Sequence, residues 1–248
     1  MASLKPEIIF GSQGVELTNT VLATVATDIV LVVLVFILTK NIKKVPGILQ
    51  SITEVGIGYF YNLTEQISGS NTKRIFPWFA SFFIFIFFSN IIGLLPGFGT
   101  IGFFQEIPEE GKKEFIPILR AATSDFNTTL ALATVSIVAT HVIAIRVVGW
   151  KDYLSRYFSF NPIYLFVGLL EIVSEASKLF SLSFRLFGNI YAGEVVLATI
   201  SSLFAFVAPL PFILLEMIVA LVQALVFAML TMVFMSILAT PHGEGGEH

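Results

Sequence analysis

Long apolar stretches are the feature that most limits how this chain can fold. Residues 21–39, 76–95 and 126–148 each form an apolar run of about 20 residues, the length with which an α-helix crosses a bilayer core of roughly 30 Å. A further run covers 212–239. In lipid every backbone N–H and C=O group needs a bonding partner within the protein, and an α-helix supplies these partners along its own length. The sequence therefore predicts an all-α membrane protein.

The composition agrees with a membrane protein and excludes several functions. Of the 248 residues 56% are hydrophobic and 12% are charged, whereas a soluble domain carries about 25% charged residues. The formal net charge of -3 argues against nucleic-acid binding, which requires a concentrated basic face. The chain has no cysteine, so disulfides and thiol chemistry are excluded. No G-x-x-x-x-G-K-[ST] loop is present, and we expect no bound nucleotide, cofactor or metal.

The remaining segments complete a single membrane domain, residues 1–248. Residues 1–20 are expected to form an N-terminal segment outside the membrane, and 98–125 a polar connector on the same side. Residues 46–70 alternate apolar and polar groups at helical spacing, which indicates an amphipathic helix on the membrane surface. The polar, glycine-rich tail 241–248 is expected to be disordered.

The charges of the loops predict the orientation of the chain. Lysine and arginine accumulate in the cytoplasmic loops of membrane proteins. If the surface helix does not cross, eight basic residues lie on one side: Lys40, Lys43, Lys44, Lys73, Arg74, Arg146, Lys151 and Arg156. The other side has four: Lys5, Lys112, Lys113 and Arg120. The N-terminus is therefore expected outside.

The apolar stretch 162–208 leaves the number of crossings open. As one helix it would be about 70 Å long, more than twice the hydrocarbon thickness. It either crosses twice or forms one strongly tilted helix. Five crossings in total would place the C-terminus inside, and six would place it outside.

Several ionisable residues interrupt this last stretch. Arg185 cannot lose its proton in a protein, and its charge at the bilayer centre costs from about 3 to about 10 kcal/mol or more. At 100° per residue, one face within about 80° holds five polar residues: Glu171, Glu175, Lys178, Arg185 and Asn189.

Other carboxylates lie away from this face. Glu194 points about 180° from Arg185 and lies about 13 Å further along the axis. Glu216 and Gln223 share a face of the last helix, because they are seven residues apart. The layout favours two polar half-paths that do not meet, with a fixed positive charge between them.

Structural alternatives exist for most of these residues. Lys178 could simply compensate Glu171 or Glu175 on its own helix. Glu194 and Glu216 could be solvated at the membrane surface. His141 is more often a packed histidine than a relay, and Asp28 receives no role. For Arg185 the alternative is pairing at a subunit interface.

The stretch Leu182 to Glu194, with the sequence LSFRLFGNIYAGE, resembles the signature of subunit a of F-type ATP synthases. The spacings from Pro162 to Glu171 to Arg185, and from Glu216 to Gln223, also agree with that family. Residues 122–130 resemble the entry to its fourth helix. The resemblance covers most of the chain from Phe76 onward.

The resemblance implies a more specific fold. The segment that carries Arg185 would be one long, tilted helix, and residues 162–240 would form a hairpin around a rotating c-ring. About five transmembrane helices would then accompany the interfacial helix, and the C-terminus would be cytoplasmic.

The resemblance also implies roles for individual residues. Arg185 would face the carboxylates of the ring. The cytoplasmic path would be lined by Asn189, Glu171 and Ser181. The outer path would be lined by Glu194, Glu216 and Gln223, with Asp125 and Asn127 nearby. Some relatives carry histidine where this chain has Glu216, so Glu194 and Glu216 are expected to form a carboxylate pair that titrates as a unit.

The implied function is that of a proton-translocating, non-catalytic stator subunit with two offset half-channels separated by Arg185. The implied partners are the c-ring, the peripheral-stalk b subunits, the lipid bilayer and the transported proton. The implied location is a bacterial plasma membrane. One alternative is a secondary transporter that uses Arg185 to bind an anion, but such folds usually contain internal repeats, and none is found. Another is a non-catalytic assembly factor.

Overall fold

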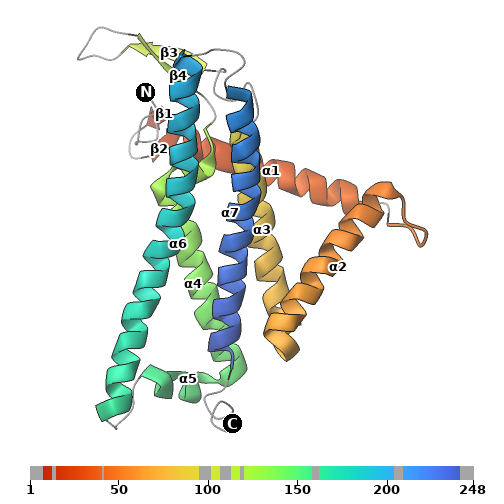
Figure 1. The fold of residues 1–248 in the computed structure, drawn as a ribbon, viewed down its shortest axis with the longest axis vertical. Helices are drawn as coiled ribbons and strands as arrows, with labels where there is room; N and C mark the ends of the chain where they lie inside the picture. The colour runs from red at the N-terminus through yellow and green to blue at the C-terminus, as the bar shows by residue number, and fades with distance from the viewer. Residues whose placement is uncertain are drawn as a thin grey trace. The chain divides into compact units, whose positions relative to one another are not determined.

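A computed structural model describes residues 8–12, 15–40, 42–94, 102–106, 113–117, 120–157, 162–203 and 209–240. Helices dominate the described chain (Figure 1). The elements in order are β1 (Ile8–Ser12), β2 (Val15–Thr18), α1 (Asn19–Lys40), α2 (Ile48–Ser68), η1 (Gly69–Asn71), α3 (Thr72–Leu94), β3 (Gly102–Glu106), β4 (Lys113–Pro117), η2 (Ala122–Ser124), α4 (Phe126–Val148), α5 (Trp150–Tyr157), α6 (Pro162–Leu203) and α7 (Pro209–Leu238).

The helices confirm the prediction of an all-α membrane protein. Four described stretches are long and apolar enough to cross a bilayer: Asn19–Lys40, Ile48–Leu94, Phe126–Val148 and Pro209–Leu238. Large apolar side chains along α1 are exposed, among them Val32, Phe36 and Ile37, as expected where lipid rather than protein covers them.

Helix α6 is continuous over 42 residues, from Pro162 to Leu203 (Figure 1). At 1.5 Å per residue it is about 63 Å long. This confirms one long helix in place of two shorter ones. Helix α6 is not among the four stretches that are long and apolar enough to cross a bilayer. It is also the helix that carries the charged residues singled out in the sequence. The tail 241–248 lies outside the described residues.

Two short β-hairpins and one short helix were not predicted. Strands β1 and β2 pair antiparallel, with Ser12 opposite Val15. Strands β3 and β4 pair antiparallel within the connector, with Phe104 opposite Phe115. The polar composition of these segments indicated loops, but short runs of aromatic and β-branched residues favour strands. Helix α5, with eight residues, is too short for a periodic pattern to identify.

The chain divides into two compact units, and the long helices contribute to both. The first unit consists of Met1–Asn41, Ile84–Thr129 and Arg185–Leu225. The second consists of Ile42–Phe83, Leu130–Phe184 and Val226–His248.

The first unit packs the start of α4 against α3 and α1. The hydroxyl of Thr123 on η2 donates a hydrogen bond to Asn90 Oδ1 of α3. Gly93 of α3 lies directly against Ala121, so closely that a Cβ atom at position 93 would overlap it. These contacts fix the segment that leads into α4.

Aromatic rings and small hydroxyls hold the second unit together. Phe60 of α2 contacts Phe79 and Phe83 of α3, with ring centroids 5.5 and 4.9 Å apart. Phe82 of α3 contacts Phe227 of α7 at 5.6 Å. Further along α7, Thr231 shares a 2.7 Å hydrogen bond with Ser136 of α4, and Ser236 donates to the carbonyl oxygen of Ile67 in α2 at 2.9 Å.

One close backbone contact joins α5 to α6. A Cβ atom at Gly168 of α6 would overlap the backbone of Tyr157, the last residue of α5. Backbone atoms, unlike the end of a flexible side chain, cannot rotate away. Glycine is therefore required at this contact.

We predict that Gly168→Ala destabilises the protein by about 1–3 kcal/mol, the usual cost of overpacking. The measurement is the thermal unfolding midpoint of the detergent-solubilised protein, which should fall. Gly58→Ala is the matched control, because a Cβ atom there meets nothing within 4 Å and alanine favours a helix over glycine by about 1 kcal/mol. A midpoint in Gly168→Ala as high as in Gly58→Ala would contradict the contact.

Candidate functional site

In the first unit, an amide pair connects α6 to α7. Asn189 Nδ2 donates a 2.7 Å hydrogen bond to Gln223 Oε1. Gln223 is only 4% exposed, and its Nε2 atom has no hydrogen-bond partner among the described residues. A buried donor without a partner is uncommon, and it provides a site for water or an incoming carboxylate. The structure thus brings together two residues that the resemblance assigned to opposite paths.

Glu194 of α6 forms an ion pair that the sequence did not predict. Its Oε2 atom accepts hydrogen bonds from Arg120 Nη2 at 2.8 Å and from Arg120 Nε at 3.1 Å. The two side chains are 11% and 24% exposed. Arg120 precedes η2, and the pair therefore ties the entry of α4 to α6.

Glu216 of α7 faces α6 at the residue next to Glu194. Its carboxyl group lies against Gly193, where a Cβ atom would overlap it. Glycine at 193 thus gives the carboxyl group room beside α6. The Glu216 carboxyl group thus lies at the turn of α6 that carries Glu194, the other member of the expected carboxylate pair. Glu194 has Arg120 as its counter-charge.

Asp125 is buried where α4 begins. Its Oδ1 atom accepts a 3.0 Å hydrogen bond from the backbone N–H of Asn127, the usual arrangement of an aspartate that caps a helix. Its Oδ2 atom accepts a 3.2 Å bond from the Thr20 hydroxyl of α1. The Asn127 side chain itself is exposed.

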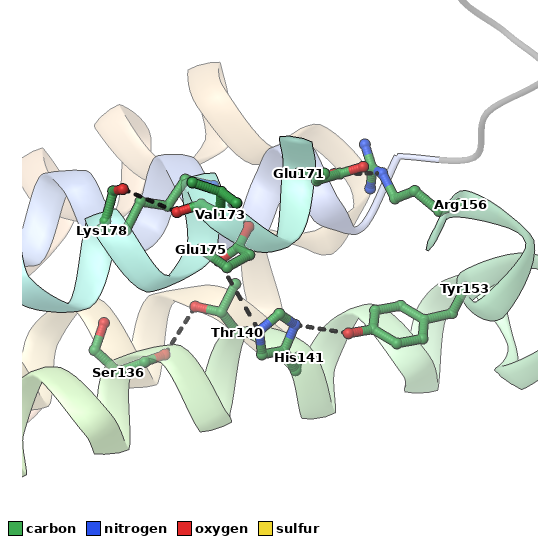
Figure 2. A network of polar contacts seen from close by, with 10 residues as sticks. Ser136, Thr140, His141, Tyr153, Arg156, Glu171, Val173, Glu175 and Lys178 are labelled. Atoms are coloured by element: carbon green, nitrogen blue, oxygen red, sulfur yellow. Dashed lines mark hydrogen bonds and ion pairs between the residues drawn. The ribbon is translucent and has the colours of Figure 1, made fainter. Parts of the chain in front are cut away.

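A second polar cluster lies within the other unit (Figure 2). Glu171 Oε1 lies 2.9 Å from Arg156 Nε, and Lys178 Nζ donates to Glu175 Oε1 at 2.7 Å. His141 lies between Tyr153 and Glu175, with Nδ1 2.8 Å from the Tyr153 hydroxyl and Nε2 3.9 Å from Glu175 Oε2. The pairing of Lys178 with Glu175 is the three-residue compensation considered from the sequence.

Two tyrosines of α5 stay protonated at neutral pH. Burial raises the pKa of Tyr153 and that of Tyr157 above the usual 10.0. A protonated Tyr153 hydroxyl can donate to the unprotonated Nδ1 atom of His141. His141 is therefore hydrogen-bonded rather than simply packed.

Arg185 differs from the other ionisable residues of α6. Among the described residues no carboxylate lies within ion-pair distance of it, and its side chain is exposed. Ser181, one turn earlier, is also exposed. Arg185 therefore presents its charge on a surface of the chain, where an acidic group of another molecule can approach it.

Sequence reasoning found the residues on α6 and α7 but missed their partners. The sequence identifies Arg120 and Arg156 only as loop charges, and no pattern in it singles out Tyr153. Their partners are 74, 15 and 12 residues away respectively, and contacts over such separations leave no local pattern. In the described part of the chain no group of three or more His, Asp or Glu side chains is arranged to hold a metal ion.

Comparison with known proteins shows the family of this chain. A family model described as ATP synthase A chain matches residues 20–236. The chain belongs to this family. It is 36% identical to ATP synthase subunit a of Geotalea uraniireducens over 207 residues, which cover 82% of this chain and 80% of the relative. It is 29% identical to ATP synthase subunit a of Moorella thermoacetica over 236 residues, which cover 95% of this chain and 97% of the relative.

Membership of the ATP synthase A chain family confirms the resemblance and the broad function. The chain is a non-catalytic subunit of the membrane sector of an ATP synthase and takes part in proton transport. The matched range runs from the second residue of α1 to the last turn of α7 and includes α2 to α6, so both polar clusters lie within the part that the family shares.

We predict that Arg120→Glu destabilises the protein by about 1–3 kcal/mol, because it places a second carboxylate beside Glu194. The charge swap Arg120→Glu/Glu194→Arg should recover at least half of the lost stability. Both are measured from the thermal unfolding midpoint of the solubilised protein. Equal midpoints for the single and the double variant would contradict a structural ion pair.

Proposed function

We propose that this chain provides two separate polar half-paths for protons and that Arg185 stands between them. One observation supports this most directly. Of the five charged residues of α6, all but Arg185 have an oppositely charged partner among the described residues. A permanent charge in hydrocarbon needs a counter-charge, and for Arg185 another chain must supply it.

The family membership supports the c-ring as this partner. The counter-charge of Arg185 is a carboxylate of the c-ring that turns against the subunit. An exposed guanidinium suits this role, because it can pair with successive carboxylates as they pass. An arginine already neutralised within its own chain could not.

The outer half-path uses polar residues of the first unit. It passes Asp125 at the start of α4, the Glu194 and Glu216 carboxylates, and the amide pair of Asn189 and Gln223. Carboxylates can take up and release protons, and a buried amide with a free donor can orient water between them.

The inner half-path uses polar residues of the second unit. Glu171 with Arg156 and Glu175 with Lys178 keep charged groups along α6, and Ser181 adds a hydroxyl towards Arg185. His141 extends this set to α4. Residues of α6 up to Phe184 belong to the second unit and those from Arg185 onward to the first, so the carboxylates before Arg185 and the one after it belong to different units.

Arg185 links the two half-paths through the ring. A proton from the outer path neutralises a ring carboxylate, and the neutral group can enter lipid, where an ionised one could not. When the ring brings a protonated carboxyl group back to Arg185, the guanidinium favours its ionised form, and the proton leaves through the inner path. The same fixed charge repels a proton that would pass directly between the paths.

The orientation follows from the loop charges. The N-terminus lies outside and the C-terminus inside, because α6 crosses once and the total is five crossings with α2 on the membrane surface. The membrane is a bacterial plasma membrane, and peripheral-stalk b subunits hold the chain against rotation. The secondary transporter remains the alternative, but no observation favours it over an ATP synthase subunit.

We predict that Arg185→Ala abolishes ATP-driven proton pumping in inverted membrane vesicles, because the other charged residues of α6 are already paired within the described chain. Pumping is measured by the quenching of a pH-sensitive dye. Lys151→Ala is the matched control, since it removes an exposed cation outside both clusters and should pump normally. Normal pumping by Arg185→Ala would exclude the proposal.

We predict a milder effect for Glu216→Gln. Pumping should continue, and its pH profile should change, because glutamine has no proton to exchange. Gly193→Ala should also change the profile without loss of folding, since the new Cβ atom displaces the flexible Glu216 carboxyl group rather than backbone. The measurement is the pumping rate across a pH series. Profiles identical to the unmodified protein in both variants would remove Glu216 from the outer path.

A further inference from the structure

Besides Arg185, two further arginines have no ion-pair partner among the described residues, and both lie in the second unit. Arg74 in the first turn of α3 and Arg146 in the last turn of α4 line one cavity of about 460 Å³, together with Trp78 and Ile143. Neither arginine has an ion-pair partner among the described residues, and both are exposed. The described residues that line the cavity include no acidic one.

Two like charges that face one cavity repel each other, so an anion that binds between them is stabilised by both. Guanidinium groups bind phosphate oxygens through two parallel hydrogen bonds. The charge and the donor geometry of the cavity therefore fit a phosphate group.

The cavity wall favours a phosphate that carries an apolar portion. Trp78 is 37% exposed and Ile143 only 6%, and they provide an indole ring and an aliphatic surface beside the arginines. The volume lies within the range of about 300–1,000 Å³ typical of ligand pockets, which is more space than a single inorganic phosphate fills.

The place of the cavity along the helices points to the same ligand. Arg74 lies in the first turn of α3, within the apolar stretch Ile48–Leu94, and Arg146 lies in the last turn of α4. Both the stretch Ile48–Leu94 and α4 are apolar enough to cross a bilayer. Helix ends of this kind lie at the depth of the lipid head groups, where tryptophan is enriched. Basic pockets between transmembrane helices bind anionic lipid head groups.

We propose that Arg74 and Arg146 bind the phosphate of an anionic phospholipid in this cavity, with its glycerol and upper acyl chain against Trp78 and Ile143. The site is separate from the proton paths, and its occupation does not depend on the role of Arg185. A bound lipid would weaken the repulsion between the two arginines, because its phosphate carries a negative charge, and it would hold α3 and α4 together at this end.

The test is native mass spectrometry of the intact ATP synthase complex, titrated with phosphatidylglycerol, phosphatidylcholine or inorganic phosphate. We expect one saturable phosphatidylglycerol site with clear preference over phosphatidylcholine. Each arginine near a membrane surface contributes about fivefold to anion affinity, so Arg74→Gln/Arg146→Gln should weaken this site about 25-fold.

The matched control is Lys73→Gln/Lys151→Gln. It removes the same charge from neighbouring exposed positions that do not line the cavity, and the affinity should change by less than about twofold. If the double arginine variant does not assemble, Trp78→Glu provides a second test, because it supplies an internal anion from a partly exposed position. This variant should also weaken the lipid site.

Several results would overturn the proposal. Phosphatidylglycerol affinity that is unchanged in Arg74→Gln/Arg146→Gln or in Trp78→Glu would exclude the site, and so would equal affinity for phosphatidylcholine. Binding of inorganic phosphate in preference to the lipid would identify a free anion as the ligand. Loss of another subunit from the arginine variant, with lipid binding intact, would identify an acidic protein segment instead.

Discussion

A charge inside a hydrocarbon layer requires a counter-charge, and this constraint explains the arrangement of α6. The helix carries five charged residues, and among the described residues Arg156, Lys178 and Arg120 neutralise the carboxylates of Glu171, Glu175 and Glu194. These partners come from α5, from α6 itself and from the segment before α4. The connecting segments thus make a charged helix compatible with lipid, and the ion pairs hold those segments in place.

Small side chains permit the contacts that this arrangement needs. Gly193 allows the Glu216 carboxyl group to lie against α6, Gly93 allows Ala121 to lie against α3, and Gly168 allows the end of α5 to touch α6. The first of these contacts involves a flexible carboxyl group, whereas the other two involve backbone. Two of the three glycines therefore serve packing alone, and Gly193 also determines where a titratable group can reside.

The sequence predicted the helices well because their signal is local. Apolar runs gave α4 its observed bounds, Phe126–Val148, and the motif around Arg185 identified the family. The sequence did not predict the β-hairpins, because their short strands lie in polar segments. It also did not predict the partners of Glu171 and Glu194. The approach of Arg120 to Glu194 spans 74 residues, and helix periodicity carries no information on such a contact. The amide pair of Asn189 and Gln223 likewise depends on how two helices meet.

The five arginines of the chain show how pairing separates structure from recognition. Arg120 and Arg156 each lie beside a glutamate, with side chains 11% and 13% exposed. Arg120 joins two segments of the first unit, and Arg156 joins two segments of the second. Arg74, Arg146 and Arg185 are exposed and have no such partner among the described residues. Because an arginine stays charged at any physiological pH, each unpaired one must meet water or an anion from outside the chain. In the proposed function the passing carboxylates of the ring serve this need for Arg185 in turn, and in the proposed lipid site a single phosphate serves both Arg74 and Arg146.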